Sequence, residues 1–336
     1  MSPARALPAA LIAPAARAWL ARARPARVLN VFDRALNLID DSGGVLSVVA
    51  HERGMTPFGL ALVPATARPF RDVTTLSPVH VHNHELSVGD VRIDLSQAQP
   101  WNPQPDWAVV RATIAANPER LEGLAASALS LGHPAQAVRQ MEFALGSLPP
   151  SATSATTSAA SPPPASLLEL YASPTPSALP PALHMRVLSG AADLVSGLLD
   201  NDEARAVHGA GQLAGAGGGL TPAGDDFAVG VFLAACAGLY GSGGAELCAP
   251  IATHMAPRTT SLSAAYLHAA ARGECAAPWH ALFAALTEPA AEARRRALAN
   301  AVDALFAVGH TSGADGLAGF LAYNQSIFRR THENPD

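Results

Sequence analysis

The chain has 336 residues, of which 49% are hydrophobic, and a formal net charge of −5. It is long enough for two domains, apolar enough for a sizeable core, and has no overall attraction to nucleic acid. All 22 lysine-plus-arginine positions are arginine. The absence of lysine excludes a Walker-type phosphate loop, a pyridoxal-phosphate Schiff base and a lysine nucleophile, because each needs the lysine amine.

The N-terminal residues resemble a weak secretory signal. Pro8, Pro14 and Arg17 interrupt the apolar stretch, and no clean cleavage site follows it. We therefore expect residues 1–24 to form an N-terminal arm. The longest apolar run, residues 227–240, is too short to cross a bilayer, so no membrane association is expected.

The cysteine content favours a reducing compartment, and we expect a cytoplasmic protein. The odd number of cysteines and the lack of metal-binding spacing support this interpretation. The three are Cys236, Cys248 and Cys275.

Residues 25–104 are predicted to form a β-rich, barrel-like domain. Short β-branched or alternating segments recur there, and Gly43-Gly44 supplies a turn. The expected strands are residues 28–32, 45–49, 79–82 and 88–95.

Three histidines in this region, His80, His82 and His84, occupy alternate positions. They would project from one face of a strand, where a metal site is one interpretation. Same-face neighbours are about 7 Å apart, so three would strain to reach one ion. A polar strand facing solvent is the favoured interpretation.

Residues 105–330 are predicted to form a mainly helical domain, so that the fold class is α+β. Apolar residues recur at helical spacing in several segments. They lie in residues 121–129, 187–198 and 298–306, and the apolar run beginning at Phe227 predicts a buried helix. Residues 149–182 are rich in serine, alanine and proline and are expected to be a mobile insertion.

The most informative motif is Gly215-Ala-Gly-Gly-Gly-Leu-Thr-Pro-Ala-Gly-Asp-Asp-Phe227. Four glycines in five residues predict a tight loop, Thr221 a helix cap and Pro222 the first helical residue. Free main-chain N–H groups at such a helix start attract phosphate or carboxylate. Asp225 and Asp226, in the first turn, favour a cation or complement the helix dipole.

A second segment, His310-Thr-Ser-Gly-Ala-Asp-Gly-Leu-Ala-Gly319, repeats this pattern in miniature. Both segments contain Gly-x-Asp-x-x-x-Gly before an apolar helix. Gly230 and Gly319 would let two helices approach closely. We expect Asp226 and Asp315 to lie on opposite walls of a shared pocket; two unrelated helix starts are the alternative.

A third segment, Arg258-Thr-Thr-Ser-Leu-Ser263, places four hydroxyl groups beside one arginine. Ordinary helix capping uses only one of these hydroxyls. The arginine fork matches the geometry of carboxylate and phosphate, so contact with an oxyanion is the other interpretation.

These three motifs resemble, in order, the hallmarks of a bacterial family named after the AllH-type subunit of oxamate carbamoyltransferase. The resemblance covers the C-terminal third of the chain. It implies a subunit of a complex that uses carbamoyl phosphate and oxamate in allantoin degradation and nitrogen metabolism. The family usually has serine where Ala223 stands and an aromatic residue where Ala314 stands, and it supplies no established catalytic residues.

The leading hypothesis is a carbamoyltransferase subunit that binds a small anionic metabolite and works with other subunits. A homo-oligomer is also compatible with the sequence. Asp225, Asp226 and Asp315 are the candidate catalytic residues, and Asp225 and Asp226 the candidate ligands of Mg²⁺, the candidate cofactor. The candidate substrate-binding residues are Gly217, Gly218, Gly219, Thr221, Arg258, Thr260, Ser261, Ser263, His310, Thr311 and Ser312.

Two alternatives come from other classes. One is a scaffold or regulatory subunit without catalytic activity, in which the glycine loop is an interface. The other is a Mg²⁺-dependent hydrolase that uses the aspartate cluster together with His310.

Overall fold

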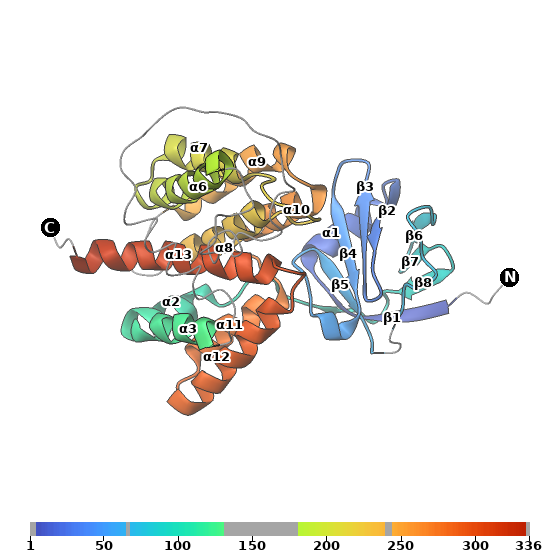
Figure 1. Cartoon of the computed structure of the whole chain (residues 1–336). Helices are drawn as coiled ribbons and strands as arrows, with labels where there is room; N and C mark the ends of the chain where they lie inside the picture. Colours follow the sequence, from blue (N-terminus) through green and yellow to red (C-terminus); the bar gives the residue numbers. More distant parts are fainter. Residues whose placement is uncertain (1–4, 65–67, 131–180, 239–243, 334–336) are drawn as a thin grey trace. The chain divides into compact units, whose positions relative to one another are not determined.

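The computed structural model describes residues 5–64, 68–130, 181–238 and 244–333 (Figure 1). The predicted insertion at residues 149–182 lies almost wholly outside the described residues. Two compact units are present: Met1–Pro105 with Glu274–Ala277, and Asp106–Gly273 with Pro278–Asp336.

The first unit is a nine-stranded sheet that nearly closes into a barrel. The strands run in the order β2-β3-β4-β5-β1-β8-β7-β6, and β9 pairs with β1. An isolated bridge between Arg27 of β2 and Pro78, just before β6, joins the two ends of the sheet. The strands are β1 (Arg5–Ile12), β2 (Ala26–Val31), β3 (Ala35–Asp40), β4 (Val45–Val49), β5 (Gly59–Leu62), β6 (Val79–His82), β7 (Glu85–Val88), β8 (Val91–Asp94) and β9 (Gln99–Pro100).

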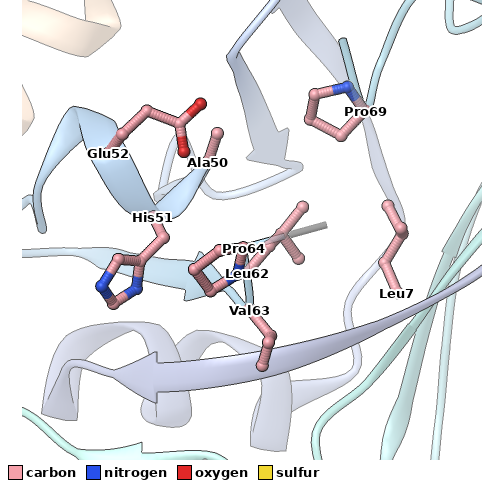
Figure 2. A pocket seen from close by; sticks show the side chains of 8 residues that line it. All are labelled: Leu7, Ala50, His51, Glu52, Leu62, Val63, Pro64 and Pro69. Atoms are coloured by element: carbon pink, nitrogen blue, oxygen red, sulfur yellow. The ribbon is translucent and has the colours of Figure 1, made fainter. Parts of the chain in front are cut away.

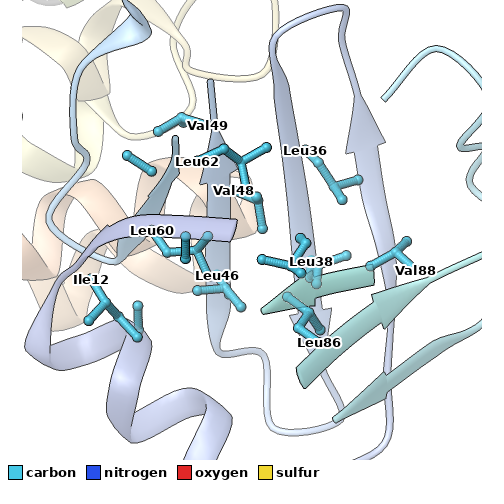
Figure 3. Packing of buried hydrophobic residues seen from close by; sticks show 14 of the residues in the cluster. Ile12, Leu36, Leu38, Leu46, Val48, Val49, Leu60, Leu62, Leu86 and Val88 are labelled. Atoms are coloured by element: carbon cyan, nitrogen blue, oxygen red, sulfur yellow. The ribbon is translucent and has the colours of Figure 1, made fainter. Parts of the chain in front are cut away.

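Apolar side chains from these strands fill the core of the unit (Figure 3). The largest of them are fully buried, namely Leu36, Leu38, Leu46, Leu60 and Leu86. Helix α1 (Pro14–Arg22) contacts β4 and β5, and the short 3-10 turn η1 (His51–Arg53) follows β4. The arrangement confirms the predicted barrel-like β-rich unit.

The N-terminal residues differ from the predicted arm. Strand β1 lies inside the sheet, antiparallel to β5 and parallel to β8, and Pro14 begins helix α1. The prolines are compatible with this arrangement. Pro8 pairs with Asp94 in the sheet, and its carbonyl accepts a hydrogen bond from the Val63 N–H.

Residues 88–95, predicted as one strand, form parts of two strands. Val88 of β7 pairs with Val91 of β8 across a two-residue turn. Gly89 in that turn has a φ of +58°, a conformation that glycine adopts without strain. The alternating pattern continues through a hairpin because both strands bury one face.

The second unit is helical, as predicted. The helices with apolar faces at residues 121–129, 187–198 and 298–306 are α3, α6 and α12. The described helices are α2 (Trp107–Ala116), α3 (Glu119–Ser130), α6 (Pro181–Leu199), α7 (Glu203–Leu213), α8 (Ala223–Ala237), α9 (Cys248–Met255), α10 (Ser261–Ala270), α11 (Ala277–Thr287), α12 (Ala291–Phe306) and α13 (Ser312–Glu333), with the 3-10 turns η3 (Ala245–Leu247) and η4 (Ala256–Arg258).

Helix α8 is buried along most of its length and lies side by side with α13 (Figure 1). The predicted close approach of these helices is present. A side chain at Gly230 would collide with the Gly316 carbonyl, and one at Gly319 with the Phe227 carbonyl. Because the backbones touch here, the starts of α8 and α13 are held near each other.

Candidate functional site

The glycine loop, defined here as Gly217–Thr221, leads directly into α8. The helix begins at Ala223, with Pro222 in the cap position, so the predicted start is wrong by one residue. Pro222 has extended backbone angles, and its carbonyl accepts hydrogen bonds from the N–H groups of Asp225 and Asp226 at 3.0 and 3.1 Å. Thr221 does not cap the helix, because its hydroxyl is hydrogen-bonded elsewhere.

The tip of the glycine loop is open to solvent. Gly218, Gly219 and Leu220 are exposed, and Gly217 and Gly219 have φ angles of +112° and +92°. Among the residues that the structure describes, no acceptor is paired with a main-chain N–H from Gly217 to Thr221. Five consecutive donors in one exposed loop are therefore available to a ligand.

Hydrogen bonds join the starts of two helices, α10 and α13, to this loop, which itself leads into the start of α8. The Thr260 hydroxyl donates to the Leu220 carbonyl at 2.6 Å and accepts from the Ser263 N–H, which caps α10. The hydroxyls of Thr221 and Ser312 share a hydrogen bond of 2.7 Å, and Ser312 begins α13. Helix N-termini carry partial positive charge, so three of them near one loop favour a negative group.

Asp225 is buried, with 1% of its surface exposed. One carboxylate oxygen accepts the Gly215 N–H at 3.0 Å, and the other accepts the Thr259 hydroxyl. Burial raises the pKa of Asp225, while the hydrogen bonds from Thr259 and Gly215 oppose this rise. Both carboxylate oxygens are thus used inside the protein.

Asp226 and Asp315 are also buried, with 8% and 0% of their surfaces exposed. Burial raises the pKa of Asp226 well above its ordinary value, and the charges of Asp315 and Asp225 raise it further. The hydroxyls of Ser312 and Thr221 act in the opposite direction. Asp226 Oδ2 has no hydrogen-bond partner among the described atoms.

The two aspartates are therefore close enough to interact electrostatically. The shared pocket stays a prediction, and the low exposed fractions of the two side chains place both in packed surroundings.

The other predicted substrate-binding residues are distributed around the loop. Ser261 is half-buried at the start of α10, whereas Ser263, two residues further on, is buried. Arg258 is exposed, and its Nη1 donates to the His254 carbonyl at 2.5 Å. His310 is exposed and Thr311 half-buried in the turn before α13.

The predicted metal roles gain no support from the geometry. Within the described residues, no group of three or more histidine, cysteine, aspartate or glutamate side chains is arranged to hold a metal ion. His80, His82 and His84 are all exposed, and His84 lies in the turn after β6. The favoured interpretation of a solvent-facing polar segment agrees with this placement.

Two residues that the sequence did not single out take part in the site. Thr259 donates to Asp225, and the Leu220 carbonyl anchors Thr260. Thr259 lies in the same hydroxyl-rich segment as the candidate residue Thr260, so the residue types of this segment indicated the right part of the chain. Which of its hydroxyls turns inward depends on the backbone path around η4.

A shallow pocket of about 220 Å³, including its opening to solvent, lies in the first unit (Figure 2). It contains none of the predicted site residues. Two of its lining side chains are polar and come from η1, and the lining residues are Leu7, Ala50, His51, Glu52, Leu62, Val63, Pro64 and Pro69.

A nearly closed β-sheet unit and a helical unit in which a glycine loop joins three helix starts define an α+β protein of two units. Residues 213–324 match the family model described as oxamate carbamoyltransferase subunit AllH, and residues 8–100 match the AllH family N-terminal domain. The chain belongs to the AllH family.

No solved structure matches the chain. Among the described helices, none is both long enough and apolar enough to span a bilayer.

Proposed function

We propose that this chain binds a small anionic substrate of the carbamoyl phosphate or oxamate type at the glycine loop, as a subunit of a carbamoyltransferase complex. The single observation that carries the proposal is the run of free N–H donors from Gly217 to Thr221, presented at three helix starts. Family membership supplies the reaction class.

The chemistry that such a loop would serve is electrostatic. In carbamoyl transfer, a substrate nitrogen attacks the carbamoyl carbon, and phosphate leaves with its charge increasing. Fixed N–H donors stabilise developing charge without reorganisation during the reaction. The Ser261 hydroxyl and the N–H groups at the start of α10 would add donors beside the loop.

An anion can bind beside the nearby aspartates only if their negative charge is reduced or balanced. Asp225, Asp226 and Asp315 would repel an anion if all were charged, but the pKa values of Asp225 and Asp226 are raised by burial. Arg258 would supply a balancing charge by rotating its exposed side chain away from the His254 carbonyl. We propose Asp226 and Asp315 as the acids nearest to the reacting groups.

Direct binding is the first test. Isothermal titration with carbamoyl phosphate, oxamate and sulfate should show binding that Arg258→Ala weakens, and bound ligand should raise the melting temperature. A carbamoyl-transfer assay of the purified chain, alone and with candidate partner subunits, tests the reaction. Absence of binding by all three anions would remove the proposed site.

A scaffold role is the second candidate, and one observation favours it. Leu220, at the tip of the glycine loop, is 42% exposed despite its large apolar side chain. An exposed leucine beside free N–H donors would suit a partner subunit that covers the loop. Activity only with a partner, together with loss of complex formation in Leu220→Ser, would favour this role.

Magnesium-dependent hydrolysis is the third candidate from the sequence and draws no comparable support. Asp225 uses both carboxylate oxygens within the protein. Mg²⁺-dependent release of phosphate from a generic phosphoester, lost in Asp226→Asn, would favour it.

A further inference from the structure

Asp225 connects two segments that are far apart in the sequence. Its Oδ1 accepts the N–H of Gly215, just before the glycine loop, and its Oδ2 accepts the hydroxyl of Thr259, just before α10. Ten and thirty-four residues separate Asp225 from these partners. One buried carboxylate therefore fixes the base of the loop to the segment that starts a neighbouring helix.

The backbone around Asp225 is closely packed. A side chain at Gly215 would lie 2.6 Å from the Arg258 carbonyl, so only glycine lets these two segments meet. The Gly224 N–H donates to the Ala216 carbonyl at 2.8 Å and closes the loop from its other end. Both ends of the loop are thus held by residues next to Asp225 in sequence or in space.

We infer that Asp225 is a positioning residue for the proposed anion site, which holds the glycine loop in shape through Gly215 and Thr259 and makes no contact with the ligand. The inference rests on the proposed function. It assigns to Asp225 a task different from the catalytic and metal-binding roles expected from the sequence.

The physical reason is the flexibility of the loop. Glycine loses more conformational freedom on ordering than any other residue. A glycine loop without an anchor would have to be ordered by the ligand, which weakens binding. An anchored loop presents its N–H donors before the ligand arrives. The burial of Asp225 and the use of both its oxygens agree with an internal anchor.

Two pairs of variants of the full-length chain test the inference, with sulfate as the probe in isothermal titration. Asp225→Ala removes both anchoring hydrogen bonds and should weaken sulfate binding about tenfold or more. Asp225→Asn keeps an oxygen for Gly215 and should stay within about threefold of the wild type. Thr259→Val should weaken binding, whereas Thr259→Ser, which keeps the hydroxyl, should not.

Hydrogen exchange supplies a readout that needs no ligand. In Asp225→Ala, amides in residues 214–224 should exchange faster, while those of α12 should be unchanged. In Asp225→Asn, protection of the loop base should be restored. If Asp225→Ala does not fold, Thr259→Val carries the same comparison, because it removes one anchoring bond and leaves the carboxylate.

Two results would overturn the inference. The first is unchanged exchange around the loop in Asp225→Ala and Thr259→Val. The second is sulfate affinity in Asp225→Asn that differs from the wild type by about tenfold or more in either direction while loop protection is normal, because Asp225 would then act on the ligand and not on the loop. If the wild type binds no sulfate, the anion site itself is refuted, and the exchange measurements alone decide the anchoring role.

Discussion

Thr221 and Ser312 are separated by 91 positions in the sequence, and their hydroxyl oxygens lie 2.7 Å apart. This hydrogen bond joins the residue before Pro222 to the first residue of α13, at the end where α8 and α13 both begin. It therefore ties the two Gly-x-Asp segments together beside the buried carboxyl of Asp226.

Ser312→Ala should destabilise the protein by about 1 kcal/mol, because Thr221 loses its partner and Asp226 loses a hydroxyl that lowers its pKa. Thermal unfolding at neutral pH measures the loss. Ser326→Ala is the matched control. Ser326 is equally half-buried on α13, and its hydroxyl bonds only within the helix, to the Ala322 carbonyl. Equal losses in both variants would argue against a special role for the Thr221–Ser312 pair.

Asp226→Asn should stabilise the protein at neutral and higher pH. The pKa of Asp226 is raised in the folded state, so the folded protein holds this proton more tightly than the unfolded chain does. Wild-type stability therefore falls as pH rises from the ordinary aspartate range through the raised pKa, by about 1.4 kcal/mol for each pKa unit. The stability difference between Asp226→Asn and wild type should grow over this window and vanish below it.

Denaturant unfolding at several pH values measures that difference. Asp303→Asn makes the same change in net charge at an exposed position and should show little effect of pH on the difference. A variant Asp226→Asn that is less stable than wild type at pH 8 would mean that the charged carboxylate stabilises the fold.

Gly230→Ala and Gly319→Ala should each destabilise the protein by about 1–3 kcal/mol, because the added methyl group meets backbone of the facing helix. Gly123→Ala is the control. Gly123 lies within α3 with no neighbouring atom close to the position of an added Cβ, so this change should be neutral or stabilise by about 0.5–1 kcal/mol. Denaturant midpoints measure all three, and neutral Gly230→Ala would contradict the close contact of α8 with α13.

Thr260→Ala should lower stability by about 1 kcal/mol and also weaken sulfate binding, because Thr260 both caps α10 and anchors the Leu220 carbonyl. Asp202→Ala separates the two effects. Asp202 caps α7 by accepting the Arg205 N–H at 3.0 Å. The variant Asp202→Ala should therefore lose a similar amount of stability, while its sulfate affinity should stay within about twofold of that of the wild type. Normal sulfate binding by Thr260→Ala would remove this residue from the anion site.

Much of the fold was predictable because its patterns are local. Helical spacing at residues 187–198 predicted the buried face of α6, and β-branched alternation predicted β4 and β6. The hairpin between β7 and β8 was missed because apolar alternation continues through Gly89. The place of β1 inside the sheet was missed because its prolines suggested an interrupted secretion signal, whereas the sheet tolerates Pro8.

The candidate site was likewise predictable only in part. The glycines, the hydroxyl-rich segment and the paired aspartates are visible as residue types in the chain. Their hydrogen-bond partners are not visible in the sequence. Thr259 meets Asp225, and Thr221 meets Ser312, only when α8, α10 and α13 pack together. The direction of the Arg258 side chain, toward the His254 carbonyl, likewise depends on the turn η4.

The sequence by itself determined the β-rich first part, the helical second part and the family, since periodicity and short motifs are properties of neighbouring residues. Only the tertiary structure decided which polar groups are buried together. Burial brings Asp226 beside Asp315 and removes both from water, and that environment, which no local pattern encodes, raises the pKa of Asp226. Likewise, packing leaves Gly218, Gly219 and Leu220 exposed to solvent at the tip of the glycine loop.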